Sequence, residues 1–295
     1  MNEAILLSIF AGFMFSIGGI AYKIGANGNV RPIQCAVFLS VVGSIVFGII
    51  GCNEWQFCTL PVYLTGIIIG VTQYWVIVFL RWALQLGPLS PTWCAVSLGF
   101  IPVIIYSALS CGEKISCYQY LSIVATVGAI VSASLSSNGG KSGKSSWKQK
   151  VLYCMILVLL VIFNSTLSVG LKVASQIDVP GTSMTLSDRC GNVILSLVYG
   201  TMMVCGVIEL TAGKKWVFNR NAFWGGALLA LGASTGYGLQ LYLVGKASAV
   251  TVFALGNTVS ILGTALMSAT FFKEKRSKSW YFTIGFSILA ILLNR

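Results

Sequence analysis

The side chains in this sequence that could bind a ligand are polar and aromatic residues placed singly inside long apolar runs. Gln73, Trp75 and Arg81 interrupt one such run, and Tyr237 and Gln240 interrupt another. Amide, indole and phenol groups can hydrogen-bond to a small organic molecule and stack on it, and they are costly to bury without a partner. These five residues are our first candidates for a small-molecule binding site.

Three further residues complete the candidate set. Trp93 offers a large aromatic face, Asn257 offers an amide, and Asn164 lies beside Ser165 within its apolar run. For Trp93 and Asn257 the alternative is helix packing, because membrane helices commonly pack through small and polar residues. For Arg81 the alternative is contact with lipid headgroups, which a long basic side chain reaches from near a helix end.

Enzyme and metal chemistry have little support in the residues present. The chain has no histidine, and its nine cysteines are scattered without a Cys-x-x-Cys pair. A zinc site needs clustered Cys or His ligands, and general acid–base catalysis most often uses imidazole. Gly143-Lys144-Ser145 resembles part of a phosphate-binding loop, but the earlier glycine is misplaced and no strand precedes it. We expect no catalytic residues, no metal and no cofactor.

The elements that position the candidate residues are predicted to be membrane helices. Hydrophobic residues make up 56% of the 295 residues and charged residues only 9%, which leaves too little polar surface to coat a soluble globule. A bilayer core of about 30 Å needs roughly 20 apolar residues per helix, so the chain can supply about ten spans. We predict helices near 4–22, 33–52, 62–84, 90–110, 117–135, 151–171, 189–208, 222–244, 250–271 and 279–293.

The net charge of +12 is explained by membrane topology. In a soluble protein it would suggest a nucleic-acid partner, but here the basic residues lie between apolar runs, so we expect no nucleic acid. The alternate connections place fourteen Lys and Arg on one side of the membrane and five, together with the termini, on the other. The positive-inside rule then places residues 136–150 in the cytoplasm and both termini outside.

An internal repeat links the two halves of the chain. Comparing residue n with residue n+161 gives nine identities across positions 107–130, including Glu113-Lys114 against Glu274-Lys275. Shared apolarity does not explain the matching charged pairs. The fourth and fifth predicted helices therefore correspond to the ninth and tenth.

The repeat defines the predicted domain organisation. Residues 1–135 and 151–295 form two five-helix repeats, and the hydrophilic stretch 136–150, rich in Ser, Gly and Lys, links them. Because each repeat has an odd number of spans, the second copy must enter the membrane from the opposite side. The predicted fold is an all-α polytopic membrane protein with ten transmembrane helices, arranged as two inverted five-helix repeats.

The Gly112-Glu113-Lys114 turn and its echo at Lys273-Glu274-Lys275 resemble the drug/metabolite transporter superfamily, in particular its ten-helix EamA-type members. The segment Trp280 to Leu293 is similar to the family's final helix, and Phe253 to Asn257 resembles the opening of its ninth. Two such repeats would cover nearly the whole chain. The resemblance implies alternating access around a central cavity lined by helices one, three, four, six, eight and nine.

The acidic residues give little indication of proton coupling. Proton-driven carriers usually place a carboxylate inside a span. Glu54, Glu113, Glu209 and Glu274 all fall in predicted connections, and Asp188 lies beside Arg189 at a predicted helix start. The basic and aromatic candidates instead favour a neutral, zwitterionic or anionic solute.

The expectation from sequence is a transporter in the plasma membrane that moves a small organic metabolite, amino-acid-like and neutral or anionic, by alternating access. Its expected partners are this solute and the lipid bilayer, and the chain is expected to be a monomer. A non-transporting scaffold or receptor and, with less support, an intramembrane enzyme are the alternatives. A polar pocket that reaches mid-depth between the halves would favour a carrier over a scaffold, and an enzyme would show convergent catalytic groups inside it.

Overall fold

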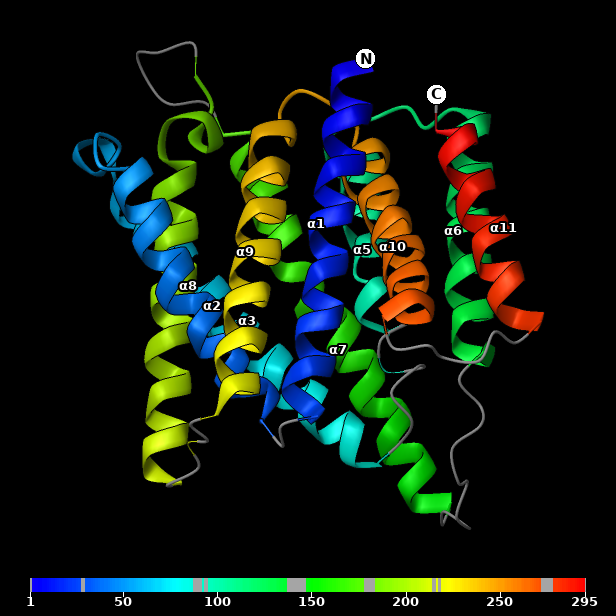
Figure 1. Ribbon diagram of the computed structural model, residues 1–295. Helices are drawn as coiled ribbons and strands as arrows, with labels where there is room; N and C mark the ends of the chain where they lie inside the picture. The colour runs from blue at the N-terminus through cyan, green and yellow to red at the C-terminus, as the bar shows by residue number, and fades with distance from the viewer. Residues whose placement is uncertain are drawn as a thin grey trace.

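A computed structural model describes residues 2–27, 30–86, 92, 95–136, 147–177, 184–213, 216, 219–271 and 278–294. In these ranges the regular elements are all helical, as the sequence predicts (Figure 1). They are α1 (Asn2–Asn27), α2 (Pro32–Ile50), the 3-10 helix η1 (Trp55–Phe57), α3 (Leu60–Leu86), α5 (Phe100–Ser110), α6 (Cys117–Ser136), α7 (Trp147–Ala174), α8 (Leu186–Ala212), α9 (Arg220–Leu243), the π-helix η2 (Val250–Ala254), α10 (Leu255–Phe271) and α11 (Lys278–Leu293).

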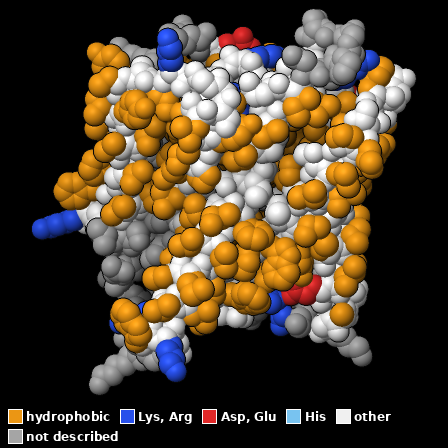
Figure 2. All heavy atoms as spheres, turned by 180° about the vertical axis from the view of Figure 1, so that it is seen from behind, with side chains coloured by type: hydrophobic (Ala, Val, Ile, Leu, Met, Phe, Trp, Pro, Cys, Tyr) orange, Lys and Arg blue, Asp and Glu red, His pale blue; other side chains and the backbone are white. Residues whose placement is uncertain are grey.

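Six of these helical segments are long and apolar enough to cross a bilayer. They lie in α1, α2, α3, α7 and α8 and in η2 continued by α10. Three shorter apolar segments, ending at Ser110, Ala133 and Leu293, belong to α5, α6 and α11. Apolar side chains cover much of the lateral surface in Figure 2, and charged groups gather toward its upper and lower ends, apart from one basic side chain that projects sideways near mid-height. The chain therefore has the helix content and surface of an integral membrane protein.

Local sequence signals set several helix ends. Pro32 opens α2, where its missing N–H and fixed φ cost nothing. The Thr185 hydroxyl accepts a hydrogen bond from the Asp188 N–H at the start of α8, and the Asn219 side chain accepts one from the Ala222 N–H at the start of α9. Such caps satisfy backbone donors that have no partner inside the helix.

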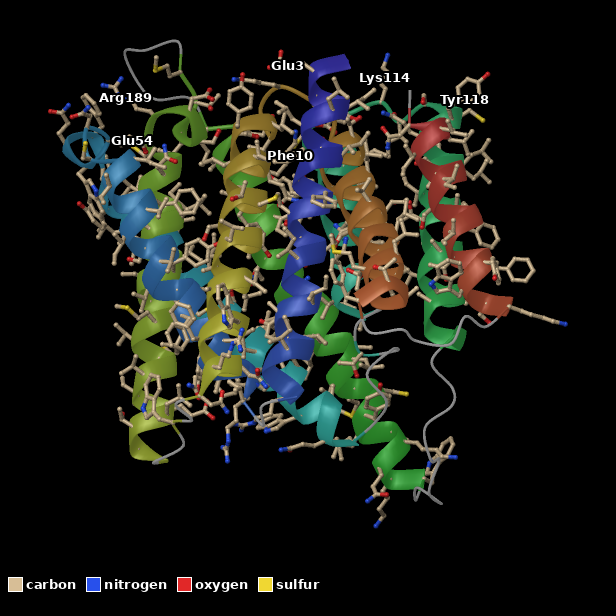
Figure 3. All side chains as sticks on the ribbon, viewed as in Figure 1. Glu3, Phe10, Glu54, Lys114, Tyr118 and Arg189 are labelled. Carbon is tan, nitrogen blue, oxygen red and sulfur yellow. The ribbon has the colours of Figure 1, made fainter. Side chains whose placement is uncertain are left out.

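The helices run back and forth between two ends of the bundle. In Figure 1 both chain termini lie at the upper end, whereas α6 finishes and α7 begins toward the lower end. Glu3, Glu54, Lys114 and Arg189 are distant in sequence, but all four lie at the upper end (Figure 3). These positions agree with the alternation of connections that the charge pattern predicts.

Helices from the two halves of the chain pack against each other. α1 packs between α9 and α10, α2 packs against α8 and α9, and α3 packs against α7 and α8. A separate pair, α6 with α11, stands at one side of the bundle (Figure 1). The main buried core accordingly draws residues from both halves, including Leu39, Phe100, Leu167 and Val198.

The helix predicted at 90–110 is not regular. Among its described residues, Leu98 and Gly99 form turns, with hydrogen bonds from Leu98 N–H to Ala95 O and from Gly99 N–H to Val96 O. These bonds reach back three residues instead of four, so the helix is tightened before α5 begins at Phe100. The predicted helix at 250–271 is also irregular, because its first five residues form the π-turn η2.

Candidate functional site

A cavity of about 170 Å³ lies between the helices of the two halves. Its walls come from α1, α2, α3, the segment around Val96 to Phe100, α7, α8, α9 and α10. Gln73 is the middle residue of α3, and Tyr199 is the middle residue of α8, so the cavity lies at about half the length of these helices. It therefore has the mid-depth position expected of a solute site in a carrier.

The cavity brings together five of the eight residues that the sequence suggests as a binding site. They are Gln73, Asn164, Tyr237, Gln240 and Asn257. Trp75 does not line the cavity and is 39% exposed. Arg81 is also absent from the walls and forms an ion pair described below. Trp93 lies outside the described residues.

Three of the lining amides use their N–H₂ groups to bond protein oxygens. The Asn164 amide donates to Val96 O at 2.9 Å. The Asn257 amide donates to Phe253 O at 2.8 Å. The Gln73 amide donates over 3.4 Å to Phe163 O and over 3.3 Å to Thr166 Oγ1. A backbone carbonyl can only accept a hydrogen bond, so each partner fixes which end of the amide is nitrogen.

Two other lining groups are buried without a hydrogen-bond partner. Gln240 is 3% exposed, and its Oε1 accepts no hydrogen bond. The Tyr199 hydroxyl, on a side chain that is 2% exposed, lies near the Ser234 hydroxyl but makes no hydrogen bond of good geometry. Leaving such groups unsatisfied in a folded protein costs about 1–3 kcal/mol each, so a ligand that bonds them recovers this energy.

Aromatic rings form the rest of the cavity's recognition surface. Phe15 of α1 meets Tyr237 of α9 edge to face, with their ring centroids 4.9 Å apart. Tyr22, Phe100 and Tyr199 also line the cavity. Ring faces of this kind pack against the C–H groups of an organic molecule.

None of the described residues that line the cavity carries a charged side chain. Arg81 of α3 instead forms an ion pair with Glu209 of α8, and the Tyr74 hydroxyl donates to the same carboxylate at 2.9 Å. The prediction that Glu209 falls in a connection is wrong, because α8 continues to Ala212. The two charges are only partly exposed, at 24% for Arg81 and 19% for Glu209.

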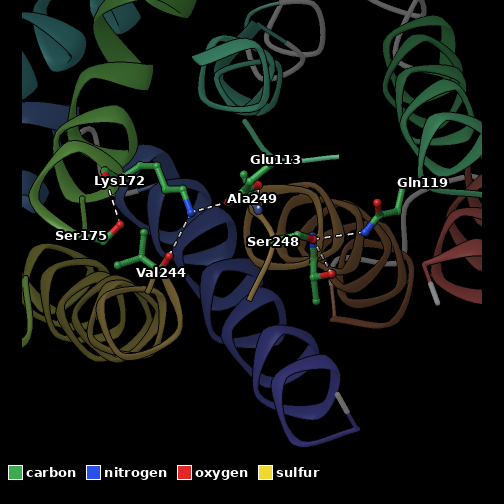
Figure 4. Close-up of polar contacts among 8 residues, drawn as sticks. Glu113, Gln119, Lys172, Ser175, Val244, Ser248 and Ala249 are labelled. Carbon is green, nitrogen blue, oxygen red and sulfur yellow. Dashed lines mark hydrogen bonds and ion pairs between the residues drawn. The ribbon is translucent and has the colours of Figure 1, made fainter. Parts of the chain in front are cut away.

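A second ion pair joins the two halves (Figure 4), and Glu113 immediately precedes Lys114, which lies at the upper end of the bundle in Figure 3. Lys172 Nζ of α7 lies 2.5 Å from Glu113 Oε1, which follows α5. The same ammonium donates to Val244 O at 3.3 Å, and the Ala249 N–H donates to Glu113 Oε2 at 2.9 Å. Lys172 is 3% exposed, so this is a buried charge that is paired with a carboxylate and bonded to a backbone carbonyl near the start of η2.

The turn before Glu113 explains how its carboxylate is placed. Gly112 has φ of +65°, in the left-handed region that glycine adopts without strain. The Glu113 N–H then donates to Ser107 O, closing the end of α5. Burial raises the pKa of the neighbouring Cys111 thiol above its ordinary value, against the opposing effect of the Lys172 charge.

Gly232-Ala233-Ser234-Thr235-Gly236 matches the Gly-x-Ser-x-Gly pattern of serine hydrolases. In those enzymes the serine occupies a sharp turn between a strand and a helix, with a histidine as its base. Here Ser234 lies inside α9, is 7% exposed and has no hydrogen-bond partner, and the whole sequence contains no histidine. The pattern is therefore explained by close packing of α9.

Several lining residues were not among the sequence candidates. Phe15, Tyr22, Phe100 and Tyr199 are aromatic residues in apolar runs, where sequence alone does not separate a cavity wall from a lipid-facing or core position. A usable signal was present on α3. Gln73, Val76, Ile77 and Leu80 all line the cavity, and their spacing of three, four and seven residues marks one helix face.

Comparison with known proteins supports the fold and leaves the family open. No protein-family model matches the sequence. No curated protein matches it. A crystal structure of another protein shares its fold, with a TM-score of 0.77 over 99% of this chain and 96% of that chain, at 13% sequence identity. A likeness at this identity concerns the fold alone.

Proposed function

We propose that this protein is a membrane transporter that moves a small organic metabolite by alternating access. The observation that carries the proposal is the uncharged cavity at mid-depth, walled by both halves and lined with amides and aromatic rings. Gln240 Oε1 and Tyr199 Oη have no hydrogen-bond partner and belong to residues of the cavity wall, so a ligand there would recover the energy of satisfying them, which favours a binding site over a scaffold. A carrier needs such a site at this depth.

The proposed architecture is ten transmembrane helices in two inverted five-helix repeats, with the relationship to the drug/metabolite transporter superfamily that the turn motifs suggest. The packing is consistent with it. Exchanging the halves replaces α1 with α7, α2 with α8, α3 with α9, α5 with α10 and α6 with α11. The contacts of α1 with α9 and α10 then become those of α7 with α3 and α5, which are present. The α2–α8 and α6–α11 contacts are each between equivalent helices of the two halves, so the exchange leaves them unchanged.

The ion pair at the upper end supports a closed state of a carrier. Glu113 belongs to the first half and Lys172 to the second, and neither residue lines the cavity; Glu113 is next to Lys114 at the upper end of the bundle. When the repeats rock, contacts between the halves break at one end of the bundle and form at the other. The cavity would thereby open to alternate sides of the membrane.

The cavity favours an uncharged solute over an anionic one. The sequence allowed an amino-acid-like solute that is neutral or anionic, with Arg81 as a basic contact. The Arg81 guanidinium pairs with Glu209 and lies off the cavity wall, so no described basic group in the wall is available to an anion. The plasma membrane as location and the monomeric state remain parts of the proposal.

Solute counterflow in proteoliposomes tests the proposal. The assay compares sugars, polyols, amino acids, nucleosides, amines and organic anions, with wild type beside Gln240→Leu in the cavity wall. Trp75→Leu is the matched control, because Trp75 is on the same bundle but outside the cavity. We expect saturable counterflow for one solute class, lost in Gln240→Leu and kept in Trp75→Leu. Folded protein that shows no counterflow for any class would favour a receptor or scaffold.

A further inference from the structure

We infer that the cavity selects an uncharged, hydroxyl-rich solute, of the chemical class of polyols and small monosaccharides. This inference rests on the proposed function, because it names the solute class for the same site. It is carried by the direction in which the lining amides are held, by the unpartnered groups beside them and by the absence of charge in the described wall.

The first step concerns the amide oxygens. Gln73, Asn164 and Asn257 have their N–H₂ groups committed to protein oxygens, two of them to backbone carbonyls alone. Their side-chain oxygens accept no hydrogen bond from the described residues. Each amide oxygen has two lone pairs, so the wall offers hydrogen-bond acceptors that call for donors on the solute.

The second step concerns charge. An ammonium group is a strong donor, but the described wall has no carboxylate to pair with it. A carboxylate on the solute would meet no basic side chain there either. The charged groups of Arg81, Glu209, Glu113 and Lys172 are already paired with each other. Because an unpaired charge loses most of its hydration in such a site, the wall disfavours a net charge of either sign.

The third step concerns Gln240 and Tyr199, whose polar atoms in the cavity wall lack a hydrogen-bond partner. The Tyr199 hydroxyl can donate or accept, and the Gln240 side-chain oxygen, which has no partner, can accept. A solute hydroxyl donates one hydrogen bond and accepts others, so neighbouring hydroxyls can satisfy amide oxygens and the Tyr199 hydroxyl together. The Phe15 and Tyr237 rings supply an apolar surface for the C–H groups between those hydroxyls.

The fourth step concerns size. The cavity volume of about 170 Å³ is smaller than the roughly 300–1,000 Å³ of pockets that bury drug-sized ligands. The site therefore suits one small molecule and excludes an oligosaccharide or a nucleotide. Within this small volume, a solute with a hydroxyl on almost every carbon makes the most hydrogen bonds to the acceptors of the wall.

Ligand-induced thermal stabilisation of the purified full-length protein tests the inference without relying on transport. The probes are a panel of polyols and monosaccharides, their deoxy analogues, amino acids, primary amines and monocarboxylates of similar size. We expect saturable stabilisation by at least one uncharged hydroxyl compound, about a tenfold loss of apparent affinity for a deoxy analogue that lacks one bonded hydroxyl, and none by amines or carboxylates.

Variants locate the binding in the cavity. Asn164→Leu and Asn257→Leu each remove one amide and should weaken binding of the hydroxyl compound about tenfold. Gln56→Leu is the matched control, because Gln56 is an exposed amide in η1 and should bind like wild type. Size-exclusion chromatography selects the variants that fold. If neither Asn variant folds, the comparison of hydroxyl compounds with their deoxy analogues on wild type decides alone.

Two results would overturn the inference. One is that no uncharged hydroxyl compound stabilises the protein, whether or not a charged compound does. The other is that stabilisation is unchanged in folded Asn164→Leu and Asn257→Leu. Counterflow separates this failure from that of the proposed function. Counterflow of an amino acid without binding of polyols would support the carrier and reject the proposed solute class. Polyol binding without counterflow would support the solute class and reject the carrier.

Discussion

Glu209 is a carboxylate held inside a largely apolar bundle by two side chains of another helix. Arg81 neutralises its charge, and the Tyr74 hydroxyl donates a further hydrogen bond. An ion pair of this kind contributes little when both partners are exposed, but removing one partner from a partly buried pair leaves the other charge unsatisfied. The cluster should therefore matter for stability more than for solute binding.

Arg81→Met should destabilise the protein by about 1–3 kcal/mol, because Glu209 would stay charged without its main partner. The double variant Arg81→Met, Glu209→Gln should recover most of the loss, since no lone charge remains. Thermal unfolding of the purified protein measures both effects. If the double variant is as unstable as Arg81→Met alone, the ion pair does not account for the loss.

The angular positions of residues around α3 explain which of its candidate binding residues line the cavity. Gln73 and Trp75 are two positions apart, which turns them by about 200° around a helix, so they cannot face the same side. Sequence reasoning chose both because each is a polar or aromatic residue in an apolar run. The same reasoning could not place Arg81, because its partner Glu209 is 128 residues away in sequence.

At the scale of elements, α1 and α10 approach closely because glycine stands at their contact. A Cβ atom on Gly12 would overlap the carbonyl oxygen of Gly256 and would lie 2.7 Å from Val259 Cβ. Small residues allow such backbone contact in membrane bundles, where packing supplies most of the association energy. The contact lies three residues from Phe15 and next to Asn257, which both line the cavity.

Gly12→Ala should therefore push α1 away from α10 and disturb the cavity. We expect a lower unfolding temperature and reduced solute binding or counterflow. Gly285→Ala is the matched control, because a Cβ there meets no atom within 4 Å. It should leave both properties unchanged. Equal effects of the two substitutions would contradict the assigned contact.

The ion pair between Glu113 and Lys172 gives a second prediction at the scale of elements. Lys172→Met removes the ammonium that joins α7 to Glu113 and Val244, so the upper end of the bundle should open more often. A single cysteine at Ser168, in the cavity wall, would then react faster with a membrane-impermeant thiol reagent added from that side. Lys114→Met, which removes an exposed charge at the same end, should not change the rate. Equal rates in both variants would show that the pair does not restrict access.

Helix existence could be predicted from apolar runs, but helix regularity could not. The run 90–110 does contain Gly99 and Pro102, and a proline cannot donate to the carbonyl four residues earlier, which here belongs to Leu98. The sequence does not show that the Val96 carbonyl, which accepts from the Gly99 N–H, also accepts from Asn164 of α7. That partner is known only once the bundle is assembled. Helix ends were also misplaced where apolar character fades gradually, as at Glu209 near the end of α8.

At the scale of the whole molecule, both chain ends lie at the same end of the bundle, and α7 starts toward the other end (Figure 1). With the native cysteines replaced by serine, single cysteines at Lys114 and at Lys148 should therefore be labelled from opposite sides of the membrane. Both positions are exposed; Lys114 lies at the upper end in Figure 3, and Lys148 lies in the first turn of α7, which begins toward the lower end in Figure 1. By the excess of basic residues, Lys148 should be on the cytoplasmic side. The assay uses an impermeant thiol reagent on intact cells and on inverted vesicles. Labelling of both positions from one side would contradict the topology.

The π-turn η2 sets the angle around the helix between Ala249, at the upper end of the molecule, and Asn257, in the cavity wall. Ala249, whose N–H bonds Glu113, lies immediately before η2, and Asn257 in the cavity wall lies three residues after it. A π-turn takes up one residue more than an α-turn, so if η2 became regular α-helix with all five residues kept, everything before it would rotate by about 100° relative to Asn257. With Asn257 kept in the wall, Ala249 would point away from Glu113. The extra residue in η2 thus allows Ala249 to bond Glu113 while Asn257, on the same helix, faces the cavity.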